Sequence, residues 1–370
     1  MVSASVLAPV TPSVLRWARL QAAASTAEVA KRAEVAENRV LAWENGTEMP
    51  SVAKLRAVAG FLRQPLALFF APAPPHDNLH LPPDFRAAGL PVGRHLAREI
   101  RLAEERRDTY KHLEPGVVAD PAWPKWRDVG LLNPGEIRAR LGVGVADIAS
   151  AKTASEALRI WITALESQGL LVFQMSGIGD EECSGFSIDD AVTPVIVLNG
   201  KDALQRRVFT LLHEVGHLLD HGGGLCALDE SVDREQVCNR FAENVLMPEF
   251  DVRAAVHGLT GTEAVERVSK RFYVSRPAAA VTLRRRGLVD QDVVDYELRR
   301  SEEAWEQTKN QTGAPPPERL KRRNLGDVYL TAVLDALDRE AISVTDATYF
   351  LAAKVGMIDK LERELAGSAP

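Results

Sequence analysis

The sequence has no long apolar segment. None of its hydrophobic runs approaches the roughly 18–20 residues that a membrane-spanning helix needs. The first residues, Met1 to Ala8, also lack the basic residues and the extended apolar stretch of a signal peptide. We therefore expect no membrane association and predict a cytoplasmic protein.

Cysteine is scarce as well. The chain contains three cysteines, Cys183, Cys226 and Cys238, with no C-x-x-C pair among them. An odd and widely spaced set argues against a disulfide framework and suits a reducing compartment. We interpret Cys226 and Cys238 as inert thiols. The alternative is thiol or redox control of Glu235, which lies between them in the sequence.

An excess of positive charge is missing too. The formal net charge is −6 at pH 7 and the sequence pI is about 5.8. This balance excludes a surface that is basic throughout, so any contact with nucleic acid must come from a local patch. With 370 residues, of which 46% are hydrophobic and 26% charged, the chain can build two or three cores, because domains cluster near ~100–150 residues.

A short motif in the middle of the chain has the pattern of a zinc peptidase. Residues 213–217 have the sequence His-Glu-Val-Gly-His inside an apolar run that is compatible with a helix. On a helix, His213 and His217 share one face and can both reach one Zn²⁺. Glu214 is then placed to accept a proton from a water that the metal activates. Because so short a motif also recurs by chance, its surroundings must decide.

A third ligand is expected from the helical run that follows a glycine-rich loop. We favour Glu235, because two histidines and one carboxylate form the open ligand set of a catalytic zinc site. Asn239, one turn later, is a candidate for a hydrogen bond to a ligand or to the substrate. Glu243 lies another turn along the same face, and spacing alone does not exclude it as the ligand. All three residues are also compatible with a solvated helix face.

The motif and its surroundings resemble the ImmA/IrrE metallopeptidases. Residues 185–187 and 194–199 look like the strand pair of that family, residues 206–211 like the start of its zinc helix, and residues 235–248 like its second signature. The resemblance extends roughly over residues 154–289. Cys238 occupies a position where alanine is often found in the family, a change that a packed helix tolerates.

The resemblance implies specific roles for the motif residues. His213, His217 and Glu235 would be the metal ligands, which favours Glu235 over Glu243, and Glu214 would be the catalytic base. The implied cofactor is Zn²⁺, although a site with two histidines and one glutamate also accepts Mn²⁺ or Fe²⁺.

The N-terminal part of the chain carries a second signal. Apolar residues recur there in short helical blocks with breaks near residues 22–24 and 33–34, a pattern that is typical of a helix-turn-helix. Residues 13–70, with Trp43-Glu44-Asn45-Gly46 at the end of the third helix, resemble the Cro/CI-type (XRE) DNA-binding domain.

This second resemblance implies two sets of DNA contacts. The start of the third helix would face the major groove, and basic side chains near it would meet phosphates. The groove residues would be Glu37, Asn38 and Arg39, and the phosphate residues Arg16, Arg19, Lys31 and Arg32. Residues 13–64 contain eight basic and five acidic side chains, a net charge of +3, which is weak for phosphate binding. A module that docks a protein is therefore the alternative.

Prolines and composition predict the domain boundaries. We expect a helix-turn-helix domain at residues 11–70, a proline-rich linker and helical connector at 71–150, the peptidase domain at 151–290 and a helical region at 291–370. The predicted fold class is α+β and mainly helical, with an all-α N-terminal domain, a zincin-like central domain with a small sheet, and a C-terminal helical appendage.

Within these domains, patterning predicts individual elements. A helix is expected near residues 154–168, strands at 169–175, 185–188 and 194–198, and a basic helix pair at 262–272 and 276–286. The basic pair either binds DNA or packs beside the active site with solvated arginines. Residues 327–340 and 343–355 are predicted to form a helical hairpin, with Ser343 and Asp346 as a capping box.

These observations lead to one function and one alternative. The resemblances imply a DNA-binding zinc metallopeptidase that regulates transcription, as in a stress response, by cleaving a partner repressor or an antitoxin-like protein. The alternative is a non-proteolytic transcriptional regulator of a toxin-antitoxin or mobile-element locus, whose zinc domain senses or binds a partner. The predicted partners are an operator DNA and the protein substrate, with a homodimer as a further candidate.

Overall fold

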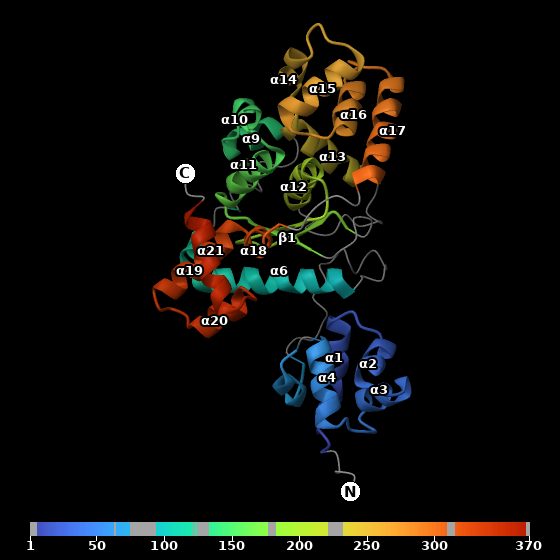
Figure 1. Ribbon diagram of the computed structural model, residues 1–370, viewed down its shortest axis with the longest axis vertical. Helices are drawn as coiled ribbons and strands as arrows, with labels where there is room; N and C mark the ends of the chain where they lie inside the picture. The colour runs from blue at the N-terminus through green and yellow to red at the C-terminus, as the bar shows by residue number, and fades with distance from the viewer. Residues whose placement is uncertain are drawn as a thin grey trace. The chain divides into compact units, whose positions relative to one another are not determined.

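The computed structural model describes residues 6–62, 64–74, 94–120, 123, 133–176, 183–220, 232–308 and 315–367. The described residues up to Leu102 form one compact unit, and those from Ala103 onward form a second. Most are helical, and the strands lie in the second unit (Figure 1). The predicted fold class, α+β and mainly helical, is confirmed. Among the helices of the described part, none is long and apolar enough to cross a membrane.

Two sequence predictions fall outside the described residues. Most of the predicted proline-rich linker lies in the gap between residues 74 and 94. Cys226 lies in the gap between residues 220 and 232.

The first unit is a small helical domain with its own core. Trp43, Leu55 and Phe69 are each at most 1% exposed and pack in one cluster with the alanines and valines of the surrounding helices. The helices are α1 (Pro12–Gln21), α2 (Thr26–Ala33), α3 (Glu37–Glu44), α4 (Val52–Leu62) and the 3₁₀ helix η1 (Leu66–Phe70).

Local sequence explains where α2 begins and ends. The Glu28 backbone N–H donates to the Ser25 hydroxyl at 3.2 Å, and the Ser25 N–H donates to the Glu28 carboxylate at 2.8 Å. This reciprocal pair is a capping box. At the other end Glu34 adopts a left-handed conformation, with a φ of 52°, and stops the helix. The break near residues 33–34 is thus where the sequence predicts it.

The second unit is built on a three-stranded sheet. Its strands are β1 (Leu171–Met175), β2 (Gly185–Ile188) and β3 (Val195–Asn199), in the order β1-β3-β2. β1 is parallel to β3, with Leu171 opposite Val195, and β2 is antiparallel to β3, with Phe186 opposite Val197. Every strand residue is buried, so both faces of the sheet must be covered. The three predicted strands are confirmed.

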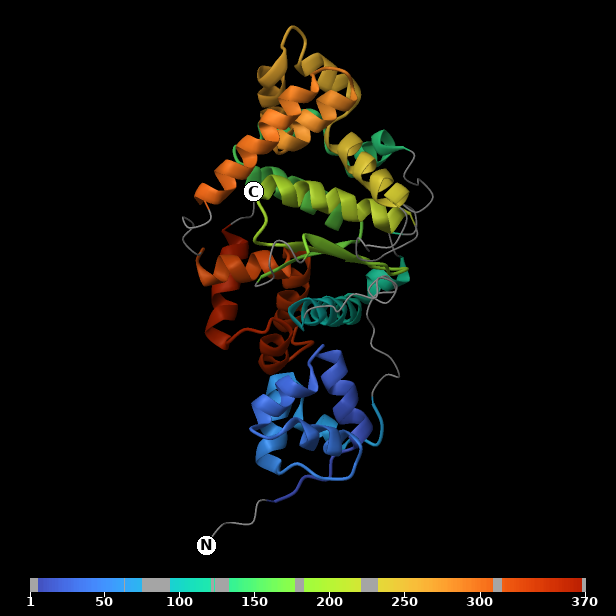
Figure 2. The same cartoon turned by 90° about the vertical axis from the view of Figure 1, so that its right-hand side faces the viewer.

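Helices cover both faces of this sheet. α11 (Ala154–Glu166) and α12 (Leu204–Leu219) lie on one face, and α18 (Pro317–Leu325) lies along the edge strand β1 (Figures 1 and 2). Side chains of further helices cover the second face. On that second face the Phe173 ring meets the Tyr329 ring edge-on, with centroids 5.8 Å apart. The Arg106 guanidinium, from α6 (Arg94–Leu113), lies 5.2 Å from the same Phe173 ring. The zinc motif therefore sits on a helix that the sheet supports.

The remaining helices complete the second unit. They are α7 (Pro115–Ala119), α9 (Pro134–Leu141), α10 (Val145–Ser150), α13 (Val232–Leu246), α14 (Glu249–Ala255), α15 (Gly261–Phe272), α16 (Arg276–Arg285), α17 (Gln291–Thr308), α19 (Asp327–Asp338), α20 (Val344–Phe350) and α21 (Val355–Ala366). A continuous apolar core joins α9 to α17 with the sheet.

The C-terminal hairpin differs in part from its prediction. Its capping box is present, because the Asp346 N–H donates to the Ser343 hydroxyl at 3.2 Å and the Ser343 N–H donates to the Asp346 carboxylate at 2.9 Å. The predicted extent of the second helix, residues 343–355, is wrong. α20 ends at Phe350, because Ala352 adopts a left-handed φ of 45°, and a separate helix, α21, begins at Val355.

Candidate metal centre

Helix α12 places two histidines on one buried face. His213 and His217 are four residues apart, are 6% and 7% exposed, and bring their Nε2 atoms within 3.0 Å of each other. Leu211, Leu212 and Val215 anchor the helix in the core around them. The predicted helical spacing therefore produces the predicted convergence of the imidazoles.

Glu235 on α13 brings a carboxylate to the same point. One of its oxygens lies 3.4 Å from His213 Nε2 and the other 3.4 Å from His217 Nε2. These hydrogen bonds to the two histidines hold the pKa of Glu235 well below its usual range, against the opposing effect of partial burial. Glu235 is thus ionised, which is the form that binds a cation.

Gly216 lets the two helices approach closely enough for this contact. A Cβ atom at this position would lie 3.3 Å from Cys238 Cβ and 3.3 Å from the Phe241 ring. These distances are tighter than ordinary van der Waals contact, so the missing side chain allows α13 to pack directly on α12. The glycine within the His-Glu-Val-Gly-His motif therefore has a packing role.

The three donors fit a zinc ion. Their ligand atoms all lie within 4.8 Å of one another. A tetrahedral zinc ion with bonds of about 2.0–2.1 Å separates its ligand atoms by roughly 3.3 Å. The observed separations of 3.0, 3.4 and 3.4 Å are close to that value. Two imidazoles and one carboxylate also form a ligand set of the catalytic type, which keeps a further coordination position for water or substrate.

Two further side chains, Glu214 and Cys238, lie next to the ligands. Glu214 is 1% exposed and lies directly after the first histidine on α12. The Cys238 Sγ atom lies 3.7 Å from His217 Nδ1, the ring nitrogen that faces away from Glu235. A group in this position can orient a ligating histidine. This contact joins two helices and could not be read from the sequence.

Asn239 and Glu243, the two other candidates on α13, do not lie with the three metal ligands. Asn239 is exposed, and no hydrogen bond links it to His213, His217 or Glu235. Glu243 is buried and forms an ion pair with Arg285 of α16. Its role as a partner of Arg285 was missed in the sequence, because the spacing along α13 does not reveal what α16 brings near it.

A cavity of about 520 Å³ lies between α12, α13 and α16, and none of the three metal ligands lines it. Phe209 forms part of its wall and stacks on the His213 ring, with centroids 6.2 Å apart. Asn239 also lines the cavity, and the Arg285–Glu243 pair closes another side. Apolar groups from α16, including Val281, complete the wall. The lining thus combines apolar side chains with polar and charged ones, as ligand sites do.

The residues predicted to contact DNA are exposed, with one exception. The exposed ones are Arg16, Lys31, Arg32, Glu37, Asn38 and Arg39. Arg19 is mostly buried and donates to both oxygens of Glu44, at 2.6 and 2.9 Å, and to the Ala24 carbonyl. Arg39 forms an exposed ion pair with Glu48 at 2.9 Å. Arg19 is therefore engaged within its own domain.

The basic pair α15–α16 makes many internal contacts. Arg276 binds both oxygens of buried Glu297, at 2.6 and 2.7 Å. Lys270 forms an ion pair with Glu266, and Arg286 donates to the Met247 carbonyl at 2.6 Å. These contacts favour the interpretation of the pair as a helical subdomain that packs beside the metal centre.

One family model matches the part of the chain that contains the metal centre. No curated protein matches the chain. No helix-turn-helix family was detected in it. Residues 165–284, which include the zinc helix, the helix that carries Glu235 and most of the surrounding core, match the IrrE N-terminal-like domain (Peptidase_M78). The chain thus contains an IrrE N-terminal-like metallopeptidase domain with a candidate zinc site formed by His213, His217 and Glu235.

Proposed function

We propose that this protein is a zinc-dependent endopeptidase that cleaves a partner repressor or antitoxin-like regulator, and that its N-terminal unit binds operator DNA. The observation that carries the peptidase proposal is the convergence of His213, His217 and Glu235 at separations that suit a tetrahedral ion. The match of the same residues to a peptidase domain family supports it.

The side chains suggest how hydrolysis would proceed. A Zn²⁺ held by the three ligands would supply a Lewis acid that polarises the scissile carbonyl and lowers the pKa of a water. The Glu214 carboxylate would accept the proton of the attacking water and donate it to the leaving amine. Its position on α12, directly after the ligand His213, favours this role.

The cavity lined by Phe209, which stacks on the ligand His213, is the proposed place of a substrate side chain. Phe209 and Val281 offer apolar surface, while the exposed amide of Asn239 offers hydrogen bonds to a peptide backbone. A volume of about 520 Å³ is large enough for one bulky side chain and its neighbours. The expected substrate is therefore an apolar segment of a protein.

DNA binding by the first unit is proposed from its exposed surface. Arg16 and Arg32 are exposed, as phosphate contacts require, and Asn38 lies at the start of α3, where a recognition helix reads bases. We expect Arg16→Ala and Arg32→Ala to weaken binding to all sequences and to flatten the salt dependence by roughly 0.9 per contact. Asn38→Ala should instead change sequence preference. A filter-binding series at several salt concentrations separates the two effects.

The decisive experiment combines purified protein with a candidate repressor, with and without Zn²⁺, and follows cleavage on a gel. We expect metal-dependent fragments from the wild type and none from Glu214→Gln. Binding of DNA without any cleavage, in a protein that retains its metal, would favour the non-proteolytic regulator.

A further inference from the structure

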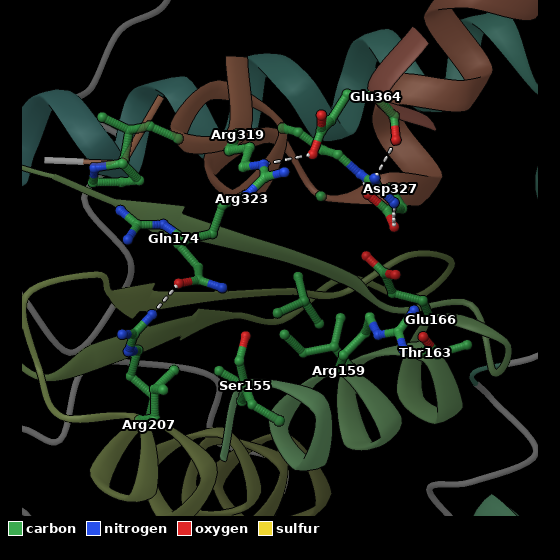
Figure 3. Close-up of a pocket in the computed structure, with 18 residues that line it drawn as sticks. Ser155, Arg159, Thr163, Glu166, Gln174, Arg207, Arg319, Arg323, Asp327 and Glu364 are labelled. Carbon is green, nitrogen blue, oxygen red and sulfur yellow. Dashed lines mark hydrogen bonds and ion pairs between the residues drawn. The ribbon is translucent and has the colours of Figure 1, made fainter. Parts of the chain in front are cut away.

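A second cavity lies away from the metal centre, on the side of β1. It has a volume of about 490 Å³. Its lower wall is formed by α11, β1 and the first turns of α12, and its upper wall by α18 with the adjoining ends of α19 and α21 (Figure 3). The upper wall lies outside the matched residues 165–284, so the cavity joins the peptidase domain to the C-terminal helices.

Arginine dominates the charged lining of this cavity. Five arginines and three acids line it, namely Arg159, Arg207, Arg319, Arg322, Arg323, Glu166, Asp327 and Glu364. Two of the arginines are neutralised, because Arg319 pairs with Glu364 at 3.1 Å and Arg322 with Asp327 at 2.7 Å. The other three form no ion pair with a carboxylate in the part of the chain that the structure describes.

Two of these three arginines come from opposite walls and repel each other. Arg207 on α12 is 8% exposed and donates to the neutral Gln174 side chain at 2.8 Å and to the Asp202 carbonyl at 2.9 Å (Figure 3). Arg323 on α18 donates to the neutral groups of Asn324 and Ser176, its hydrogen-bond partners among the described residues. Burial, followed by the nearby charge of Arg323, lowers the pKa of Arg207 to about 10, although the Asp202 carboxylate opposes this effect.

The third acid that lines the cavity, Glu166, does not offset this charge. Glu166 is buried, and its carboxyl points toward Asp327 (Figure 3). Burial raises its pKa to about 8, so it is largely protonated at neutral pH. Its buried Oε1 atom has no hydrogen-bond partner among the residues that the structure describes. The cavity thus carries an excess of two to three positive charges in a partly desolvated space, an arrangement that is costly unless an anion compensates it.

We propose that this cavity binds a small organic anion that carries two negative charges, either a phosphate group or a pair of carboxylates. Arg207 and Arg323 would bind the anionic group from both sides, since guanidinium groups bind phosphate and carboxylate oxygens through paired hydrogen bonds. Arg159, exposed on α11, would contact the rim of the ligand. The volume suits a metabolite-sized molecule.

Such a ligand would connect the C-terminal helices with the zinc helix. Arg207 lies on the same helix as His213, and Arg323 lies on α18. An anion held between them would fasten α18 to α12 by replacing a repulsive contact with two attractive ones. The binding proposal does not depend on peptidase activity and is tested without it.

The test is calorimetric titration of the intact, metal-loaded protein with inorganic phosphate, pyrophosphate and succinate, in separate runs at matched ionic strength set with chloride. We expect saturable binding of at least one probe, and the preferred probe distinguishes phosphate from dicarboxylate ligands. Arg323→Gln should weaken this binding at least tenfold, equivalent to about 1.4 kcal/mol. Arg159→Gln, at an exposed position that should not affect folding, should weaken it by a smaller factor.

Two controls make the result decisive. Arg300→Gln removes an exposed arginine of α17 that does not line the cavity and should leave binding unchanged. Glu235→Gln disables the metal centre and should also leave it unchanged. The proposal is overturned if no probe binds, if Arg323→Gln and Arg300→Gln behave alike, or if binding is lost in Glu235→Gln, which would place the anion on the metal.

Discussion

At the scale of single residues, three side chains from two helices carry the metal site. Because each supplies one of three protein ligands, His217→Ala should abolish stoichiometric zinc, and Glu235→Ala should reduce zinc affinity strongly. Glu214→Gln should retain zinc and lose cleavage, since Glu214 is not among the three converging ligands. Metal content per chain, measured on purified variants, checks these expectations.

Glu243→Ala is the matched control for Glu235→Ala, because both positions lie on α13 and both carry a glutamate. Glu243 binds Arg285 instead of the metal, so its loss should leave zinc content intact and lower stability by about 1–3 kcal/mol. Full zinc content in His217→Ala would remove the site as described. A greater zinc loss in Glu243→Ala than in Glu235→Ala would move the third ligand to Glu243.

The buried Glu166 leads to a prediction about how the stability of the protein depends on pH. Burial raises its folded-state pKa from 4.5 to about 8; the charge of Asp327 adds to this effect and a backbone hydrogen bond from Val172 opposes it. Tyr110 and the Arg322–Asp327 pair are the other titratable groups nearby. Between these two pKa values the folded state holds a proton that the unfolded state has released, so the contribution of Glu166 to stability falls as pH rises.

Between the unfolded-state and folded-state pKa values of Glu166, its contribution to the free energy of unfolding should fall by about 1.4 kcal/mol per pH unit. Glu166→Gln cannot ionise, so it should lose less stability than the wild type between about pH 6 and 8. Urea unfolding of both proteins across this range measures the difference. Parallel pH profiles would mean that Glu166 is ionised in the folded protein.

At the scale of elements, the site depends on how closely α13 packs on α12. A methyl group at Gly216 would press on Cys238 and Phe241 at 3.3 Å. Gly216→Ala should therefore cost about 1–3 kcal/mol in stability. It should also weaken zinc binding, because Glu235 moves with α13. Thermal unfolding and a competitive zinc titration measure the two effects.

Gly60 provides the comparison for this substitution. It also lies within a helix, α4, but a Cβ atom there would meet nothing within 4 Å. Gly60→Ala should stabilise the protein by up to about 1 kcal/mol through helix propensity alone. Equal effects of Gly216→Ala and Gly60→Ala on stability would show that the contact between α12 and α13 accommodates a methyl group.

The elements also show which features a sequence can predict. His213 and His217 were predictable because they lie on one helix, where spacing determines which side chains share a face. The three strands were predictable because their apolar runs are short and bounded by polar segments. The third ligand needed the family resemblance, since Glu235 and Glu243 share a face of α13 and only the packing against α12 and α16 separates them.

Other features depend on contacts between distant segments and could not be predicted. The cavity between α11, α12 and α18 brings together residues 159, 207 and 323, whose proximity no periodicity indicates. The end of α20 was misplaced because Ala352 adopts a left-handed conformation that alanine seldom takes. Arg19 looked available for DNA, yet its partner Glu44 lies two helices later.

At the scale of the whole molecule, the chain combines a small helical unit with a larger one that contains the metal centre. The matched family domain, residues 165–284, forms only part of the larger unit. α11 and α18 extend beyond it at either end, and both contribute to the arginine-lined cavity. The cavity is therefore formed partly by residues inside the matched range and partly by residues outside it.

The covalent connection between the two units leads to the last prediction. If the first unit binds an operator at which the substrate repressor is also bound, the peptidase is held near its substrate, and the effective concentration rises to about the mM range. Cleavage should then be faster on operator DNA than on unrelated DNA or without DNA, at protein concentrations below the solution affinity for the repressor. A protein that lacks the residues before Pro72 should cleave at the same rate in all three conditions. Equal rates for the intact chain, with DNA binding verified in the same samples, would mean that the first unit serves autoregulation or protein docking and does not deliver the peptidase to its substrate.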